Sequence, residues 1–183
     1  CSSDLSGRLV IVTGPPGAGK STISRGLALA WPAEAAFHVH SDDLWTYFVK
    51  GRIPPWEPRS AAQNAVVTEA MAAQAAALAS AYPVIFDGVV GPWFLEPFRE
   101  AARRAGARLD YLVLRPSREA TVSRGVSRVG HPMRDPEVIG RMWDQFSDLG
   151  DLEGHAYDTS RLSAEQATAG ALAALASDDY RLM

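Results

Sequence analysis

Leu9-Val10-Ile11-Val12-Thr13, together with the run Gly14-Pro15-Pro16-Gly17-Ala18-Gly19-Lys20-Ser21 that follows it, is the most informative part of this sequence. The apolar residues Leu9 to Val12 are mostly β-branched and predict a buried β-strand. The glycines and prolines after them predict a loop, and a helix is expected from Ser21 to Leu29. The run matches G-x-x-x-x-G-K-[ST], and a strand before it with a helix after it is the context that this phosphate-loop motif requires.

The chemistry of such a loop follows from its backbone. Glycines allow successive amide groups to point at an anion, and the helix N-terminus adds the positive end of its dipole. Lys20 is expected to contact the β- and γ-phosphates, and Ser21 to bind Mg²⁺. Lys20 and Lys50 are the only lysines, against sixteen arginines, so a lysine at this position by chance is improbable. The predicted nucleotide-binding residues of the loop are Gly14, Pro15, Pro16, Gly17, Ala18, Gly19, Lys20, Ser21 and Thr22, with ATP or GTP and Mg²⁺ as cofactors.

Strand patterns and helix patterns alternate along the rest of the chain. Further strands are predicted at residues 36–39, 83–88, 109–114 and, weakly, 155–159. Helices are predicted at residues 44–49, 60–80, 97–105, 117–129, 135–149 and after 163. The starts of two of these helices, at Ser60–Gln63 and Ser163–Gln166, have the form of capping boxes. The alternation predicts an α/β fold with a parallel sheet and helices on both of its faces, in one domain of residues 1–183.

Composition and charge exclude several other classes. The net charge of −3 and the pI near 5.8 offer no basic surface for a nucleic-acid backbone, so a nucleic-acid partner is unlikely. Cys1 is the only cysteine, which excludes an intrachain disulfide and favours a reducing, cytoplasmic location. No apolar run approaches the roughly 20 residues that span a bilayer, so no membrane association is predicted.

Four features together resemble one family. They are the early phosphate loop, the acidic turn Ser41-Asp42-Asp43, the segment Val84-Ile85-Phe86-Asp87-Gly88, and the arginine-bearing helix after residue 117. The chain resembles the small P-loop metabolite kinases, nearest to the chloramphenicol phosphotransferase branch and more distantly to gluconate, shikimate and adenylate kinases. The resemblance implies a P-loop NTPase three-layer sandwich with a five-stranded parallel sheet in the order 2-3-1-4-5. It also implies a helical lid at about residues 124–137 and an acceptor-binding segment at about residues 42–62.

Two acids have roles implied by this resemblance. Asp42 matches the acid that accepts the proton of the substrate hydroxyl, and a carboxylate beside the phosphate loop at the end of a strand suits that task. The alternative is that Asp42 or Ser41 only caps the following helix. Asp87 matches the acid that faces Mg²⁺ through water, and its alternative is an ordinary Asp-Gly turn.

Arginines of the predicted lid are the next candidates. Arg124 and Arg128 are four residues apart and share a helix face, where the resembling kinases carry arginines that close on the phosphates. Both are therefore predicted catalytic residues, and Arg128 is also predicted to bind the nucleotide. Arg134 is a further candidate for the same role, and Arg115 receives no role. Solvated helical arginines are the common alternative.

The acceptor site should come from residues 42–62 and from the loop after Asp87. Its candidate residues are Asp42, Trp45, Arg52, Trp56, Asp87 and Trp93. Aromatic residues could make a wall for a ring-bearing acceptor, although any single one is more often part of the core. The carboxylate-binding pattern of shikimate kinase and the Asp-Gly-Phe-Pro-Arg of adenylate kinase are not found. His38 and His40 alternate on a strand, and without a third ligand at a convincing spacing we favour packing or hydrogen bonding over a metal pair.

The sequence is consistent with three functions. The leading hypothesis is a kinase that moves the γ-phosphoryl group of ATP to a hydroxyl of a small molecule, and the resemblance makes an antibiotic or related natural product a candidate acceptor. A polynucleotide 5′-kinase shares the loop and the acidic turn, but the acidic pI weighs against it. A nucleotide-dependent switch would bind the nucleotide and predicts that Asp42 is dispensable.

Overall fold

A five-stranded parallel sheet forms the centre of the molecule. The structure is a computed structural model that describes residues 7–128 and 133–183. The strands are β1 (Arg8–Thr13), β2 (Phe37–His40), β3 (Val84–Asp87), β4 (Arg108–Leu114) and β5 (Ala156–Tyr157). They pair in parallel in the order β2-β3-β1-β4-β5, which confirms the predicted order.

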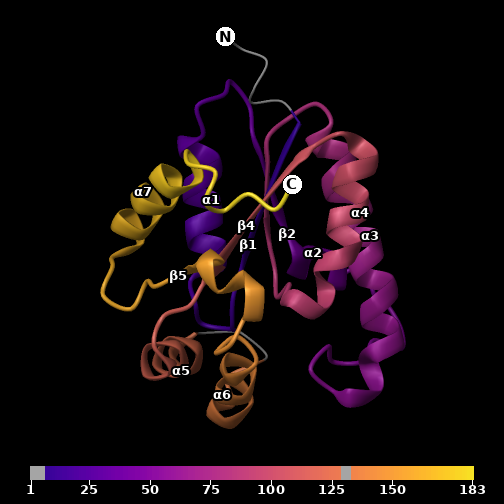
Figure 1. Ribbon diagram of the computed structural model, residues 1–183. Coiled ribbons are helices and arrows are strands. Elements are labelled where there is room, and N and C mark those ends of the chain that lie inside the picture. The colour runs from indigo at the N-terminus through magenta and orange to yellow at the C-terminus, as the bar shows by residue number, and fades with distance from the viewer. Residues whose placement is uncertain (1–6, 129–132) are drawn as a thin grey trace.

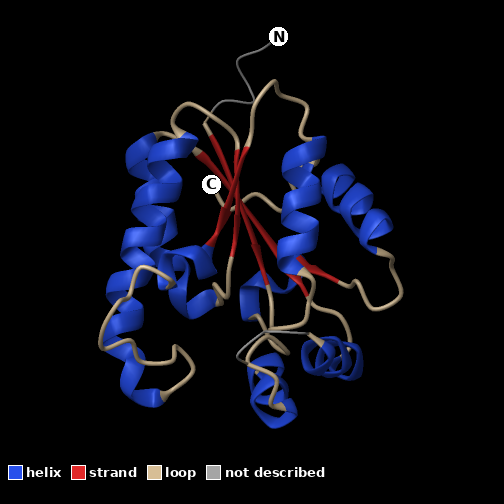
Figure 2. Cartoon of the chain, turned by 180° about the vertical axis from the view of Figure 1, so that it is seen from behind, coloured by secondary structure: helices blue, strands red, loops and turns tan. Residues whose placement is uncertain are grey.

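Helices cover both faces of this sheet, as Figures 1 and 2 show. On one face α1 (Lys20–Ala30) packs beside α7 (Ala164–Leu175), and on the other α3 (Ala61–Ala79) packs beside α4 (Leu95–Ala105). The short helix α2 (Ser41–Trp45) follows β2 directly. A pair of helices, α5 (Arg118–Ser127) and α6 (Pro136–Asp144), lies beyond the carboxyl ends of the strands (Figure 1). The three-layer arrangement places the predicted phosphate loop at that same end.

Residue alternation along β1 divides the core into two layers. Leu9 and Ile11 are fully buried against α3 and α4, whereas Val10 and Val12 are fully buried on the α1 side. A strand buried on both faces is what a continuous apolar run in a parallel sheet predicts. The phosphate loop therefore grows from the most enclosed strand of the sheet.

One of the two predicted capping boxes is absent from the structure. The predicted capping box at Ser60 is wrong, because the Ser60 hydroxyl donates to the carbonyl oxygens of Pro55 and Glu57 instead. Gln63 pairs with the backbone of Ile53 through both of its amide atoms. The capping box at Ser163 is present, with both of its hydrogen bonds. The side chains at the start of α3 thus hold the preceding connection in place.

Two predicted helices are shorter than expected. The helix expected over residues 44–49 is instead α2, which begins at Ser41 and ends at Trp45, and the Thr46 hydroxyl donates to the Asp43 carbonyl at its end. The helix expected to reach residue 149 ends at Asp144 and is followed by a 3-10 turn at Gly150–His155. The Asp135 side chain caps α6, accepting from the amides of Glu137 and Val138. Among the described residues, no helix combines the length and the apolar character needed to cross a membrane.

Candidate functional site

Three glycines give the phosphate loop its shape. Gly14, Gly17 and Gly19 have φ angles of 137°, 88° and 90°, a region that other residues rarely adopt. A β-carbon on Gly14 would lie 2.2 Å from the Leu114 carbonyl oxygen, and one on Gly17 would lie 2.4 Å from that of Thr121. Glycine is therefore required at both positions for conformation and for space. The loop packs directly against β4 and α5.

Lys20 lies at the centre of this loop. Its Nζ donates to the carbonyl oxygens of Gly14 and Pro15, each at 3.0 Å. The pKa of Lys20 is lowered to about 8, mainly by desolvation; the carboxylates of Asp87 and Asp42 oppose this shift, and the Arg128 cation adds to it. The strand register agrees with the influence of Asp87 on this ammonium, because Asp87 is the partner of Val12, two residues before the loop begins.

Asp87 is the most enclosed acid of the site. It ends β3, is fully buried, and accepts a hydrogen bond on each oxygen, from His38 Nε2 at 2.8 Å and from His40 Nδ1 at 2.5 Å. Burial alone would raise the pKa of Asp87, but the two imidazole hydrogen bonds outweigh it and lower the pKa to about 2. The pKa of His40 is raised in turn, mainly by its hydrogen bond to Asp87. Asp87 is thus an ionised carboxylate held by imidazoles, not a turn acid held by amides.

Asp42 lies in the first turn of α2 and is exposed to solvent. His40 occupies the N-cap position of this helix and no side chain caps it, so the capping alternative for Ser41 and Asp42 is not realised. The Asp42 carboxylate lies 3.7 Å from His40 Nε2. A β-carbon on Gly88 would meet the Ser41 hydroxyl at 2.7 Å, which shows how closely α2 approaches the end of β3. A single imidazole therefore lies between the two acids.

Residues that could hold Mg²⁺ are Ser21 in the first turn of α1 and Asp87 at the end of β3. A hydroxyl and an ionised carboxylate are the hard oxygen donors that Mg²⁺ prefers, and Mg²⁺ keeps several waters when bound. Asp87 is buried and anionic, which suits a contact made through such a water. The donor set next to the phosphate loop therefore fits a nucleotide-bound Mg²⁺.

The four candidate arginines occupy different surroundings. Arg124 donates to the carbonyl oxygens of Thr159 and Ser160, at 3.3 and 3.4 Å, so it faces the segment after β5. Arg128 is exposed, and its cation acts on Lys20. Arg134 donates to the Val126 carbonyl at 3.0 Å, and Arg115 is paired with Glu153. Part of the predicted lid, residues 129–132, lies outside the described residues.

The aromatic candidates fall into two groups. Trp45 stacks on Phe48 at 5.9 Å between ring centroids, and the Arg52 guanidinium lies 5.8 Å from the Trp45 ring. Trp93 is half exposed and packs on Phe146, 5.4 Å away, in the segment that follows α6. Trp56 is also partly exposed, at 39%. Trp45 and Arg52 are therefore brought together, whereas Trp93 belongs to a second surface.

The loop after β3 is fixed by two side chains that the sequence analysis did not single out. The Val90 amide donates to the Thr13 hydroxyl, and the Tyr111 hydroxyl donates to the Val90 carbonyl, both at 2.8 Å. Burial raises the pKa of the Tyr111 hydroxyl. Val90 is thereby tied to β1 through its amide and to β4 through its carbonyl.

A family model described as an AAA domain matches residues 9–149 of this chain. The chain belongs to this AAA domain family. The match begins in β1, includes the phosphate loop and both acids, and ends after α6. In a comparison with curated protein sequences, none matches this chain.

Solved structures resemble this chain over almost its whole length. A gluconokinase from Sinorhizobium meliloti 1021 is 22% identical with a TM-score of 0.66, and the match covers 93% of this chain and 92% of that one. An APS kinase from Mycobacterium tuberculosis in complex with AMPPNP and APS is 15% identical with a TM-score of 0.69, covering 94% and 99%. A tunicamycin resistance protein from Deinococcus radiodurans is 15% identical with a TM-score of 0.62, covering 92% and 95%. At these identities the likeness establishes the P-loop NTPase fold.

The contact of Asp87 with both histidines was missed by the sequence analysis. The expected hydrogen bonding of His38 and His40 is present, but their common partner comes from a strand 47 residues further along the chain. The signal lies in the strand register, because His40 pairs with Asp87 and His38 with Ile85 between β2 and β3. Without the register, a third residue for the pair could not be identified.

Proposed function

We propose that this protein is a small-molecule kinase that transfers the γ-phosphoryl group of ATP to a hydroxyl of its acceptor. The observation that carries the proposal is the pair of acids beside the phosphate loop: Asp87 is the register partner of Val12, and His40 lies between Asp87 and the exposed Asp42. A nucleotide switch needs the lysine and a metal-facing acid, but it has no use for a second, exposed carboxylate in this place. The names of similar structures, among them a gluconokinase and an APS kinase, support a kinase activity.

Each residue has a distinct task in the proposed reaction. The amides of Gly14–Lys20 and the Lys20 ammonium hold the β- and γ-phosphates, and Ser21 and Asp87 hold the nucleotide's Mg²⁺. When bound, Mg²⁺ supplies positive charge that offsets the charge developing on the phosphoryl oxygens. Asp42 orients the acceptor hydroxyl and takes its proton. As the bond from the acceptor oxygen to the γ-phosphorus forms, the bond from that phosphorus to the bridging oxygen breaks and ADP leaves.

Arginines of the proposed lid, residues 124–137, would complete the charge around the phosphates. Arg128 is exposed and close enough to lower the pKa of Lys20, so the two cations would share the phosphate charge once nucleotide binds. Arg124 would reach the phosphates only by leaving the carbonyl oxygens of Thr159 and Ser160. Closure of this kind excludes water and neutralises the transferred group.

We further propose that the acceptor is a ring-bearing small molecule bound between residues 42–62 and the loop after Asp87. The stacked Trp45 and the Arg52 guanidinium form one surface, and the half-exposed Trp93 and Trp56 provide more aromatic area. Exposed aromatic side chains of this kind suit stacking against a flat or sugar ring. An antibiotic or related natural product fits this description, and the likeness to a tunicamycin resistance protein supports it.

The experiment that tests the proposal is product detection by mass spectrometry. The protein is incubated with Mg-ATP and a pooled library of hydroxyl-bearing metabolites and antibiotics, beside Asp42→Asn and Asp43→Asn. We expect one product heavier by a phosphoryl group, reduced about 100-fold or more in Asp42→Asn because a positioned base is lost. Asp43→Asn, the neighbouring exposed acid, is the matched control and should keep the activity. Binding of ATP without any product, or equal activity of the Asp42 variant, would favour the switch instead.

A further inference from the structure

Three potential metal ligands meet on one face of the sheet. His38 and His40 alternate along β2 and so point to the same side, and Asp87 of β3 is the register partner of His40. The ligand atoms of the three side chains all lie within 4.8 Å of one another. Within residues 7–128 and 133–183 no other group of histidine, cysteine and acidic side chains meets this criterion. The cluster is half-buried at the histidines and fully buried at the acid.

We propose that His38, His40 and Asp87 form a binding site for a divalent transition-metal ion of the zinc class. Two imidazole nitrogens and one carboxylate oxygen are a common donor set for Zn²⁺, with a fourth position left for water. Metal–ligand bonds of about 2.0–2.1 Å place neighbouring tetrahedral ligand atoms about 3.3 Å apart. The two His–Asp distances of 2.8 and 2.5 Å are already shorter than this, so each pair has to open by less than about 1 Å.

The surroundings of His40 support the same conclusion. A histidine that binds a metal through one ring nitrogen usually gives its other N–H to a carboxylate, which fixes the ring and its tautomer. His40 turns Nδ1 toward Asp87, and Asp42 lies 3.7 Å from its other nitrogen, Nε2. Asp42 thus lies on the side of the ring away from the proposed ion, where such a carboxylate would stand, and it is not a fourth ligand.

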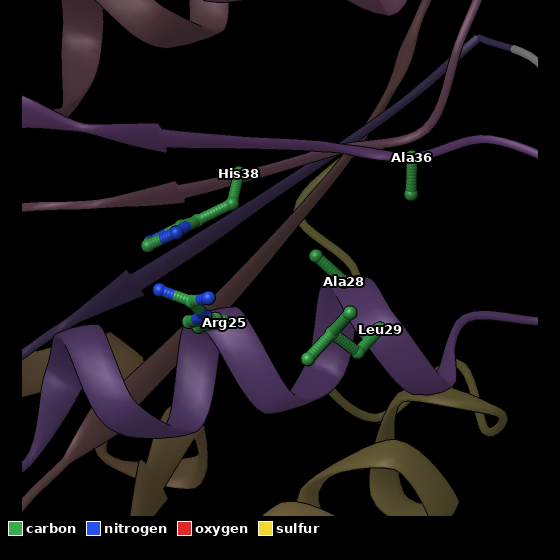
Figure 3. A pocket seen from close by; sticks show the side chains of 5 residues that line it. All are labelled: Arg25, Ala28, Leu29, Ala36 and His38. Carbon is green, nitrogen blue, oxygen red and sulfur yellow. The ribbon is translucent and has the colours of Figure 1, made fainter.

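One member of the cluster, His38, also borders a hollow beside α1. His38 lines a hollow of about 260 Å³ together with Arg25, Ala28, Leu29 and Ala36 (Figure 3). Figure 3 shows the Arg25 guanidinium facing the His38 ring. A fixed cation beside the ring repels a divalent ion, so Arg25 should weaken the site without contributing a ligand. Removing its charge should therefore tighten metal binding.

The proposed ion differs from the Mg²⁺ of the nucleotide in its ligand preference. Mg²⁺ prefers oxygen donors and octahedral geometry, whereas two imidazoles select a softer ion. Both sites use Asp87, so an ion held by the histidines would withdraw that carboxylate from the nucleotide. Micromolar Zn²⁺ should then inhibit phosphoryl transfer even in millimolar Mg²⁺. This consequence rests on the proposed kinase function, but binding of the ion does not.

Cobalt absorption in the visible range tests the site directly, because Co²⁺ replaces Zn²⁺ and its bands report tetrahedral nitrogen and oxygen ligands. The nucleotide-free protein is titrated with Co²⁺ in millimolar Mg²⁺, in a Cys1→Ser background that removes the only thiol. We expect one equivalent to bind, with at least tenfold weaker binding in His38→Gln and several-fold tighter binding in Arg25→Gln. Circular dichroism verifies the fold of each variant.

Two results would overturn the proposal: no tetrahedral band at one equivalent of Co²⁺, or a band that His38→Gln leaves unchanged. The inhibition is then measured separately, as the Zn²⁺ concentration that halves phosphoryl transfer, in the protein and in His38→Gln. Resistance of His38→Gln to Zn²⁺ supports the shared use of Asp87. If no transfer is detected at all while the cobalt band is present, the kinase proposal fails and the metal site stands.

Discussion

The phosphate loop and the proposed acceptor segment are built in opposite ways. In the loop, Gly14 and Gly17 have positive φ angles and backbone atoms fill the place of any β-carbon. In the acceptor segment, Gly51 also has a positive φ, of 74°, but no atom lies within 4 Å of its β-carbon position. Tyr47 and Val49 beside it are 71% and 98% exposed. One region is fixed by packing and the other is largely open.

The two regions therefore differ in how tightly the fold fixes their geometry. The loop has to present its amides and Lys20 in one geometry, and contacts with β4 and α5 enforce it. The acceptor segment is fastened mainly at its far end, where Gln63 binds Ile53 and Asn64 binds Pro55. In the proposed kinase, substitutions at the exposed residues of this segment should therefore disturb the sheet less than substitutions in the loop.

The largest effect is expected from Lys20→Ala, with Lys50→Ala of the acceptor segment as the comparison. Loss of the Lys20 charge should lower kcat/KM by about 10³-fold, or about 4 kcal/mol, because this cation stabilises the transferred phosphoryl group. Lys50→Ala should leave nucleotide affinity unchanged. Steady-state kinetics and ATP binding by calorimetry measure the two effects. Equal losses in the two variants would remove the distinction between the regions.

Two glycine variants test the packing difference in the free energy of unfolding. Gly17→Ala should cost about 3 kcal/mol, because strain at positive φ adds to a clash with the Thr121 carbonyl oxygen. Gly51→Ala has the strain without the clash and should cost about 1 kcal/mol. Urea denaturation monitored by circular dichroism gives both values. Similar costs would mean that the loop relaxes away from α5.

The lowered pKa of Lys20 predicts a pH dependence of the free energy of unfolding that arises in the phosphate loop. Its folded pKa of about 8 lies below the ordinary lysine value of 10.5 expected in the unfolded chain, so the unfolded chain holds more protons between these two pH values. The free energy of unfolding should therefore rise from about pH 8 toward pH 10, and Lys20→Met should lack this increment. Nucleotide phosphates should raise the pKa.

The chain is well suited to this measurement because it has only two lysines. Side-chain ¹⁵N-lysine NMR should give two signals, and Lys50→Arg assigns the remaining one to Lys20. We expect a midpoint near pH 8 that moves upward with ATP. A Lys20 midpoint that stays above pH 10 without nucleotide would show that the ammonium is better solvated than its contacts suggest.

The smallest effect is expected in the acceptor segment itself. Arg52→Ala removes the guanidinium beside Trp45, a contact of about 0.5–1 kcal/mol at an exposed site, and should raise KM for the acceptor about two- to fivefold. The KM for ATP and kcat should not change. Arg59→Ala is the matched control, since Arg59 is paired with Glu57 and is exposed. A loss of kcat in Arg52→Ala would place this residue nearer the phosphates than we propose.

Most of the fold could be predicted because it depends on local patterns. The buried β1 run, the glycine loop and the alternation of strands and helices each follow from short stretches of sequence. The bounds of α2 and the cap of α3 were less accessible, since Ser60 and Gln63 bind the preceding connection where a capping box was expected. A pattern of residue types cannot tell a helix cap from a side chain that holds the preceding loop.

The candidate site could likewise be predicted from the sequence only in part. Lys20, Asp42 and Asp87 were predicted from the sequence as site residues, and in the structure His40 lies between the two acids. The contacts of His38 and His40 with Asp87 depend on the register of two strands separated by more than 40 residues. The orientation of Arg124 toward Thr159 and Ser160 depends on how α5 packs, which helix periodicity alone does not define. Long-range placement is therefore what the sequence lacked.

The double fastening of Val90 has a consequence for solvent exchange. Its amide hydrogen is bonded to the Thr13 hydroxyl in the buried centre of the sheet, and its carbonyl is held by Tyr111. An amide of this kind exchanges with deuterium only when the surrounding sheet opens, although it belongs to a loop. Val90 should therefore retain its hydrogen as long as β1 does, while the amides of Tyr47 and Val49 lose theirs within the shortest labelling time.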